Sequence, residues 1–144
     1  MPTRYDILQL IPQRPPIVMV SSFDGFDGKI SLTTLAISPD NIFVADGKLQ
    51  ESGIIEHIAQ SAAARSGYES LLQNKNVSLG YIGAVEKLQL YALPSVGERL
   101  TTRIEVLQEV FGITLVEAET LSGDQPICRC RMKIFIESNH EKEA

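Results

Sequence analysis

The chain has few of the features that mark specialised classes of protein. It contains no tryptophan, two cysteines and two histidines in 144 residues. No apolar run approaches the ~20 residues of a membrane-spanning helix, and the N-terminus has no apolar segment typical of a secretory signal. The net charge is −5 and the basic residues are scattered, which argues against nucleic acid or an anionic membrane as the main partner. We expect a cytoplasmic protein with one core, stable without disulfides or metal.

The two cysteines, Cys128 and Cys130, have the C-x-C spacing of half a metal site. No second ligand pair accompanies them, because His57 is far upstream and His140 lies in a polar C-terminal segment. Alternate residues of a strand share one face, so we expect both cysteines to be small buried side chains. No metal or other cofactor is therefore expected.

Apolar residues alternate with polar ones in much of the second half of the chain, which is the period of a half-buried strand. The pattern is interrupted at Phe111-Gly112, and residues 122–125 (Ser-Gly-Asp-Gln) predict a hairpin turn. The connections are too short for crossover helices, so the strands are expected to be antiparallel. The predicted strands are residues 17–23, 29–37, 81–91, 100–107, 113–121 and 128–136.

One long helix is predicted between the two groups of strands, from Ser52 or Gly53 to about Leu72, because apolar residues recur there at helical spacing. Three consecutive alanines, residues 62–64, keep this helix slim enough to approach a sheet closely, and Gly67 marks another point of close packing. A single sheet with one helix leaves a face and an edge uncovered. The pattern therefore predicts a homodimer.

Glu56 is the first candidate for chemistry, because it lies in an otherwise apolar part of this helix. Burial would raise its pKa toward neutrality and suit it to proton transfer; alternatively, it is an exposed first-turn glutamate favoured by the helix dipole. His57 points about 100° further round the helix, so the two side chains do not face each other, and a hydrogen-bonded core or interface histidine is expected. Gln60, one turn after Glu56, would line the same pocket.

Several motifs, in their order along the chain, resemble those of the 3-hydroxyacyl-[acyl carrier protein] dehydratases, which are hotdog-fold enzymes. Residues 6–20 contain Ile-Pro-Gln-Arg-Pro-Pro, similar to the family's Leu-Pro-His-Arg-x-Pro, and residues 53–61 (Gly-Ile-Ile-Glu-His-Ile-Ala-Gln-Ser) look like its helix motif. Residues 80–87 resemble the following strand, and residues 94–100 its Pro-x-x-Gly-Asp turn. The resemblance implies an α+β hotdog domain, in which an antiparallel sheet of five to six strands wraps a central helix and dimerises edge to edge.

We expect this domain to occupy residues 1–136, followed by a polar tail at residues 137–144. The resemblance also implies the reaction, which removes water from a 3-hydroxyacyl thioester and leaves a trans-2-enoyl thioester. The substrate would be carried by acyl carrier protein or coenzyme A. The apolar faces of helix and sheet would form the acyl tunnel.

The family's residues can be carried over position by position. In the family, a loop histidine and a helix carboxylate of the partner subunit share the proton transfers. Glu56 matches the carboxylate and Gln60 matches the glutamine one turn later, while Gly53 or its neighbours would offer an N–H group to the thioester oxygen. Phe43 and Tyr81 are the remaining substrate contacts that the resemblance implies.

The chain departs from the family at the loop before the helix, where Asp46 stands in place of the histidine and the family's Pro-Gly residues are missing. Gln13 also replaces the histidine of the opening motif. The chain looks like the divergent branch from aryl-polyene and flexirubin pigment clusters, whose members keep Asp-Gly at this place in the loop.

Three interpretations of the missing histidine are open. Asp46 replaces it and forms a carboxylate pair with Glu56; or His57 reaches the site from another direction; or the chain is a non-catalytic hotdog subunit that binds acyl chains or pairs with an active dehydratase. Thioester hydrolysis, with Glu56 and a water molecule, is a further alternative. Asp46-Gly47 is also a plain turn signal, and Tyr81 is also a typical packed strand residue.

A carrier protein would be strongly acidic, so a chain of net charge −5 would need a local basic patch to bind it. The candidates for such a patch are Arg14, Arg65 and Lys87. The sequence alone does not place these three side chains on one surface.

Overall fold

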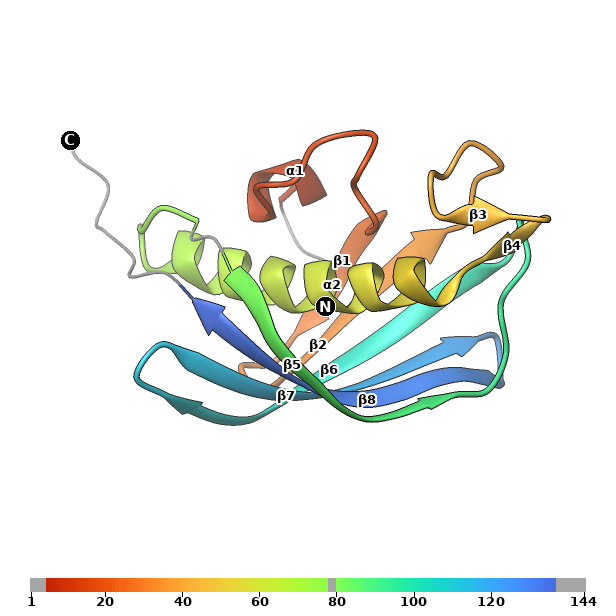
Figure 1. The fold of residues 1–144 in the computed structure, drawn as a ribbon. Helices are drawn as coiled ribbons and strands as arrows, with labels where there is room; N and C mark the ends of the chain where they lie inside the picture. Colours follow the sequence, from red (N-terminus) through yellow and green to blue (C-terminus); the bar gives the residue numbers. More distant parts are fainter. Residues whose placement is uncertain (1–4, 78–79, 137–144) are drawn as a thin grey trace.

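The computed structural model describes residues 5–77 and 80–136 (Figure 1). A long helix, α2 (Glu51–Leu72), lies across a six-stranded antiparallel sheet. The strands of this sheet are β1 (Ser22–Phe26), β2 (Ile30–Ala36), β5 (Gly80–Leu90), β6 (Arg99–Val110), β7 (Ile113–Ser122) and β8 (Gln125–Ile136). The short helix α1 (Ile7–Leu10) and a hairpin of β3 (Val44–Ala45) and β4 (Lys48–Leu49) complete the described elements. The predicted tail at residues 137–144 lies outside the described residues.

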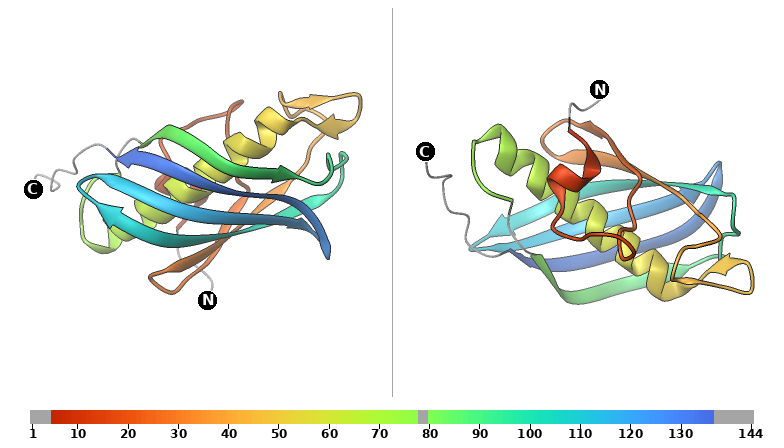
Figure 2. Two further views of the ribbon diagram at one scale, coloured as in Figure 1. Left: turned by 60° about the horizontal axis from the view of Figure 1, so that its bottom comes forward. Right: turned by 90° about the horizontal axis from the view of Figure 1, so that it is seen from above.

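The strand order is β1-β2-β6-β7-β8-β5, so β1 and β5 are the two edges of the sheet. The sheet curves around α2, which runs diagonally across its concave face (Figures 1 and 2). Strand β5 follows the helix in the sequence but, among the described strands, pairs only with β8, the last one. The predicted architecture, a central helix wrapped by an antiparallel sheet, is confirmed.

Helix α2 is covered on two sides. Its sheet side contributes Ile54, Ile58 and Ala62 to the main core, and α1 lies over the opposite side (Figure 1). Gly67 is needed at the contact with α1, because a Cβ atom there would lie 1.9 Å from the Leu10 carbonyl oxygen. The close packing predicted for Gly67 is therefore confirmed. Neither of the described helices is long and apolar enough to cross a membrane.

Alternation along β8 places the cysteines as predicted. Cys128 and Cys130 are free thiols buried against α2. The residue between them, Arg129, faces outward and forms an ion pair with Glu117 of β7. The predicted burial of both cysteines is thus confirmed.

The strand predicted at residues 17–23 is wrong, because β1 begins only at Ser22. The preceding segment crosses α2, and helix side chains satisfy the backbone groups of Met19 and the carbonyl of Ile17. Met19 N–H donates to Gln60 Oε1 at 2.6 Å, and the Met19 carbonyl accepts from His57 Nδ1 at 2.7 Å. Met19 and Val20 are buried, and the backbone groups of Met19 bond to helix side chains and not to a neighbouring strand. The Ser21 N–H, just before β1, donates to the Thr34 carbonyl of β2 at 2.7 Å.

Candidate functional site

A pocket of about 340 Å³ lies between α2 and the edge strand β5. It is lined by Glu56, Ala59 and Ala63 from the helix, by Gly80, Tyr81 and Ile82 from β5, and by Gln13 and Ile134. The alanines lie three and seven residues after Glu56 and so continue the same helix face. Their small side chains leave the space that larger residues would fill. The pocket brings together the predicted residues Glu56 and Tyr81.

Gln60 fixes the carboxylate of Glu56 from one side. Its amide nitrogen donates to Glu56 Oε2 and to the Ile17 carbonyl, both at 2.8 Å. The amide oxygen of Gln60 accepts from Met19 N–H, so these partners determine which way the buried amide points. Glu56 itself is half-buried. Its other oxygen accepts no hydrogen bond from the described residues, which leaves that oxygen available to a ligand.

His57 lies next to Glu56 in the sequence but points away from the pocket. Its ring is fully buried, and Nδ1 contacts the Met19 carbonyl while Nε2 lies 2.8 Å from Thr102 Oγ1. Because a carbonyl only accepts, Nδ1 carries the proton and Nε2 accepts from Thr102, whose hydroxyl is 2.6 Å from that of Thr120. The expectation of a hydrogen-bonded core histidine is confirmed, and both ring nitrogens are occupied.

Burial also keeps His57 uncharged. Desolvation lowers the pKa of the ring to about 4, while the hydrogen bond to Met19 opposes this shift only in part. The ring is neutral at pH 7 and has no free nitrogen facing the pocket. The interpretation in which His57 reaches the site from another direction therefore does not hold in this conformation.

Asp46 lies at the turn of the β3–β4 hairpin, just before α2. Both Asp46 and Gly47 have positive φ angles, 53° and 74°, as a two-residue type I′ turn requires. Asp-Gly is a favoured pair in such turns, so hairpin geometry is a sufficient reason for these residues. Asp46 is exposed and does not line the pocket around Glu56 in the single chain.

Phe43 and Gly53 lie at the N-terminal end of α2. A Cβ atom on Gly53 would lie 2.5 Å from Phe43 Cβ and 2.7 Å from a methyl group of Leu49, so only glycine allows the hairpin to pack here. The Gly53 N–H already donates to the Gln50 carbonyl at 3.0 Å. An oxyanion contact at this helix end thus depends on the neighbours of Gly53, and close packing explains the glycine.

The basic patch proposed from the sequence does not form as expected. Arg65 is buried and binds Glu109 at 3.0 Å and Glu69 at 3.4 Å, so it is not available to a partner protein. Arg14 and Lys87 are exposed. The prediction for Arg65 is wrong because the arginine closes a structural ion pair between α2 and β6.

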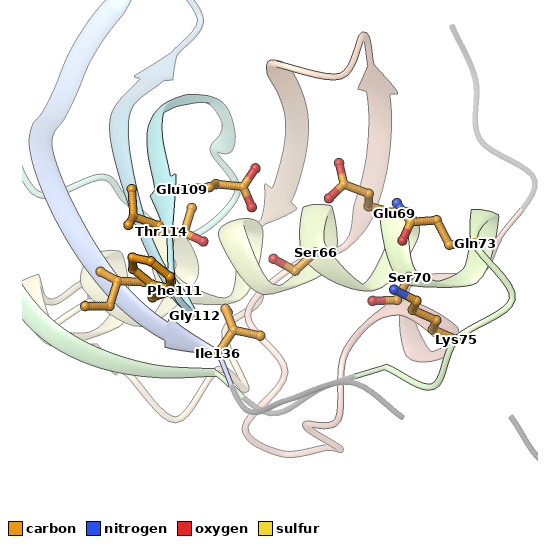
Figure 3. A pocket seen from close by; sticks show the side chains of 12 residues that line it. Ser66, Glu69, Ser70, Gln73, Lys75, Glu109, Phe111, Gly112, Thr114 and Ile136 are labelled. Carbon is orange, nitrogen blue, oxygen red and sulfur yellow. The ribbon is translucent and has the colours of Figure 1, made fainter. Parts of the chain in front are cut away.

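A second pocket, of about 470 Å³, lies at the far end of α2 beside the β6–β7 turn (Figure 3). Two carboxylates, Glu69 and Glu109, approach it from the helix and from β6, and Ser66, Lys75 and Thr114 are also labelled around it. None of the predicted site residues lies there. No cluster of three metal-binding side chains occurs anywhere in residues 5–77 and 80–136.

An antiparallel sheet curved around one long helix, with a carboxylate-lined pocket beside an edge strand, defines a hotdog-fold protein. The chain belongs to the ApeP-like family, because the family model described as ApeP dehydratase matches residues 5–143. The predicted resemblance to hotdog-fold dehydratases of pigment clusters is therefore confirmed. A search of curated proteins found no match.

Solved structures share the fold at low sequence identity. The dehydratase heterocomplex ApeI:P from Xenorhabdus doucetiae superposes with a TM-score of 0.89 at 17% identity, covering 94% of this chain and 93% of that one. A virulence protein from Campylobacter jejuni gives 0.69 at 15% identity, with 92% and 85% covered. A hypothetical thioesterase with coenzyme A from Streptococcus pneumoniae gives 0.63 at 8%, with 84% and 88% covered.

The sequence did not single out every residue of the pocket. Gln13 was noted only as a replacement for a family histidine, yet its side chain lines the pocket together with Glu56. Gly80 and Ile82 were assigned to a strand without a role. The signal that could have found them is the small-residue stripe at Ala59 and Ala63, which leaves room between the helix and whatever strand lies beside it.

Proposed function

We propose that the chain is a subunit of an acyl-thioester dehydratase that acts on 3-hydroxyacyl thioesters attached to an acyl carrier protein. The observation that carries the proposal is the half-buried carboxylate of Glu56, held by Gln60 in a pocket otherwise lined mainly by apolar and small residues. Membership of a dehydratase family supports the same reaction type.

In this proposal Glu56 is the base. Its unoccupied oxygen takes a proton from C2 of the substrate, the C2–C3 double bond forms, and the C3–O bond breaks. The departing hydroxyl takes a proton from an acid and leaves as water. The thioester oxygen, which gains charge in this step, would be stabilised by N–H groups of the first turn of α2, whose N-cap residue Gln50 makes no side-chain cap.

A second subunit would complete the site. Strand β5 is an edge strand, and its exposed apolar residues include Tyr81, Ile82 and Leu88. An edge of this kind is suited to pair with another sheet, and the pocket lies directly beside it. The second subunit could be another copy of this chain or a different hotdog subunit; the name of the ApeI:P heterocomplex indicates the latter arrangement for that protein. Either kind of pairing would bring a second β3–β4 hairpin to the pocket. Asp46 on that hairpin would then be the acid.

A non-catalytic role is the second candidate, and one observation favours it. Asp46 has a complete explanation as a turn residue, so the chain lacks a proven substitute for the family's histidine. In this case the chain would bind acyl groups or support an active partner subunit. Thioester hydrolysis is the third candidate, in keeping with the thioesterase among the similar folds.

The test of the catalytic proposal is hydration of a crotonyl thioester by the Glu56→Gln variant. We expect turnover to fall by at least about hundredfold, within the range for a general acid–base group, without loss of the folded state by circular dichroism. Glu51→Gln, an exposed residue of the same helix, is the matched control and should keep full activity. Unchanged turnover in Glu56→Gln would remove Glu56 from the mechanism.

Asp46→Asn separates the first two candidates. Asparagine tolerates the positive φ angle of the turn, so a drop in turnover of about tenfold or more would reflect lost proton transfer and not a damaged hairpin. Turnover equal to that of the unmodified protein would leave Asp46 as a turn residue. Hydrolysis would be detected in the same assay as release of free thiol.

A further inference from the structure

The pocket contains a second polar group besides Glu56. The side-chain amide oxygen of Gln13 is buried and has no hydrogen-bond partner among the described residues. Gln13 lines the same pocket as Glu56. Buried polar atoms are nearly always paired in folded proteins, so an unpaired buried oxygen on a residue that lines a pocket points to a missing partner.

The segment that carries Gln13 is held in place independently of its side chain. Arg14 Nη1 donates to the carbonyl groups of Ile11 and Gln13, at 2.8 and 2.7 Å. Further along, the Ile17 N–H donates to the Arg14 carbonyl at 3.1 Å, and the Ile17 carbonyl accepts from Gln60. The loop is thus tied to itself and to the residue that holds Glu56, so the backbone at Gln13 is held in place before any ligand arrives.

The other side chains of the pocket do not meet the need of this oxygen. Ala59, Ala63, Ile82 and Ile134 carry no donor, and no pocket residue, the hydroxyl-bearing Tyr81 included, is a hydrogen-bond partner of this oxygen. The missing partner must therefore bring a donor of its own. A hydroxyl group suits the site best, because it donates and accepts, and so matches the amide whichever way its oxygen and nitrogen are oriented.

We propose that Gln13 recognises the 3-hydroxyl group of the substrate and makes the pocket selective for 3-hydroxyacyl thioesters over saturated ones. This inference rests on the proposed function, since it assigns the pocket beside Glu56 to that substrate. The hydroxyl hydrogen bonds to Gln13 while C2 faces the carboxylate. After elimination the enoyl product has no hydroxyl on C3, so the contact is lost and the product binds more weakly.

The experiment compares two unreactive ligands, the amide analogues of 3-hydroxyoctanoyl-pantetheine and octanoyl-pantetheine, by isothermal titration with the full chain. The unmodified protein should bind the hydroxylated analogue about fivefold to tenfold more tightly, the effect of one neutral hydrogen bond. Gln13→Leu should bind the two analogues with equal affinity, because the hydrogen bond that distinguishes them is lost. Gln13→Met, which matches the shape of glutamine more closely, should behave in the same way.

Gln125→Leu, the same replacement at the exposed β7–β8 turn, is the control and should keep the preference. A preference that survives both Gln13 variants overturns the inference, and so does equal binding of the two analogues by the unmodified protein. Neither of these results affects the proposed reaction. If the unmodified protein binds neither analogue, the proposed function fails and this inference fails with it.

Discussion

His57 connects the core of the sheet to the segment that positions the site. Through Nδ1 it holds the Met19 carbonyl, and the Met19 N–H in turn holds Gln60, the partner of Glu56. Through Nε2 it accepts from Thr102 on β6. A neutral ring makes both hydrogen bonds. In a protonated ring Nε2 would also carry a proton and would face the Thr102 hydroxyl, which already donates its own proton to Nε2. The arrangement therefore depends on the ring remaining uncharged.

This dependence predicts a loss of stability in mild acid. The pKa of His57 lies near 4 in the folded state and near 6.5 when unfolded, so below pH 6.5 the unfolded chain binds a proton that the folded chain does not. The free energy of unfolding should fall between pH 6.5 and about 4, by about 3 kcal/mol in total. Urea unfolding at several pH values measures this change in the free energy of unfolding. His57→Asn, which keeps a donor but does not titrate, should be nearly flat from pH 6.5 to 5; an equal slope in both proteins would contradict this account.

Some site residues could be predicted from their near neighbours in the sequence, and others could not. Glu56 and Gln60 were expected on one side of the helix because they are one turn apart, and Gln60 does donate to Glu56, but it is buried behind the carboxylate and is not among the residues that line the pocket. The burial of His57 followed from its apolar neighbours. Gln13 was not identified as a pocket residue, since its place depends on how residues 11–21 cross the helix. That path is fixed by side chains of α2 that bond to backbone groups far away in the sequence, and no periodicity reports such contacts.

At the scale of elements, the β6–β7 hairpin carries an unusual turn. Phe111 and Gly112 connect Val110 to Ile113, with φ angles of 50° and 79°, so this is a second turn of type I′. Asparagine or aspartate normally occupies the first position, because a bulky side chain is strained at positive φ. Here the residue is a phenylalanine that is 100% exposed, so packing against the part of the chain that the structure describes does not offset the strain.

Phe111→Asn should therefore stabilise the protein. Relief of the backbone strain is worth about 1 kcal/mol, which would raise Tm by about 3 °C in a protein of this size. Phe111→Leu removes the ring but keeps a bulky residue at positive φ, so its Tm should not rise. Thermal unfolding followed by circular dichroism compares the two variants. A lower Tm for Phe111→Asn would mean that the ring has a stabilising contact, such as one to another subunit.

Elements whose neighbours lie close in sequence were predicted well. The helix and the strands after it lie within a few residues of their expected bounds, because alternation and helical spacing follow from burial on one face. The first strand was displaced, since an apolar segment packed over a helix has the same composition as a strand. The two-residue strands β3 and β4 were not predicted as strands because the Asp-Gly turn that joins them gives the stronger signal.

At the scale of the whole molecule, the edge strand β5 is the surface through which we propose that the chain pairs with another subunit. We expect the purified chain to form dimers or larger assemblies in light scattering. Leu88→Lys, which places a charge on the exposed edge, should raise the dissociation constant at least about tenfold, as charges on edge strands oppose pairing. Leu107→Lys on the central strand β6 is the control, because Leu107 is 40% exposed and Leu88 is 37% exposed. A monomer at every concentration would contradict pairing through β5, unless a different subunit restores assembly.

The strand order also affects how the chain folds during translation. During translation the helix and β5 leave the ribosome well before β8, which is the one described strand that pairs with β5. Until β8 emerges, β5 of the nascent chain exposes apolar side chains and has no strand to pair with, and strands in this state are prone to aggregate. A chain truncated before β8 would leave β5 without a partner strand, so termination of translation before β8 should give an insoluble product and not a smaller folded domain.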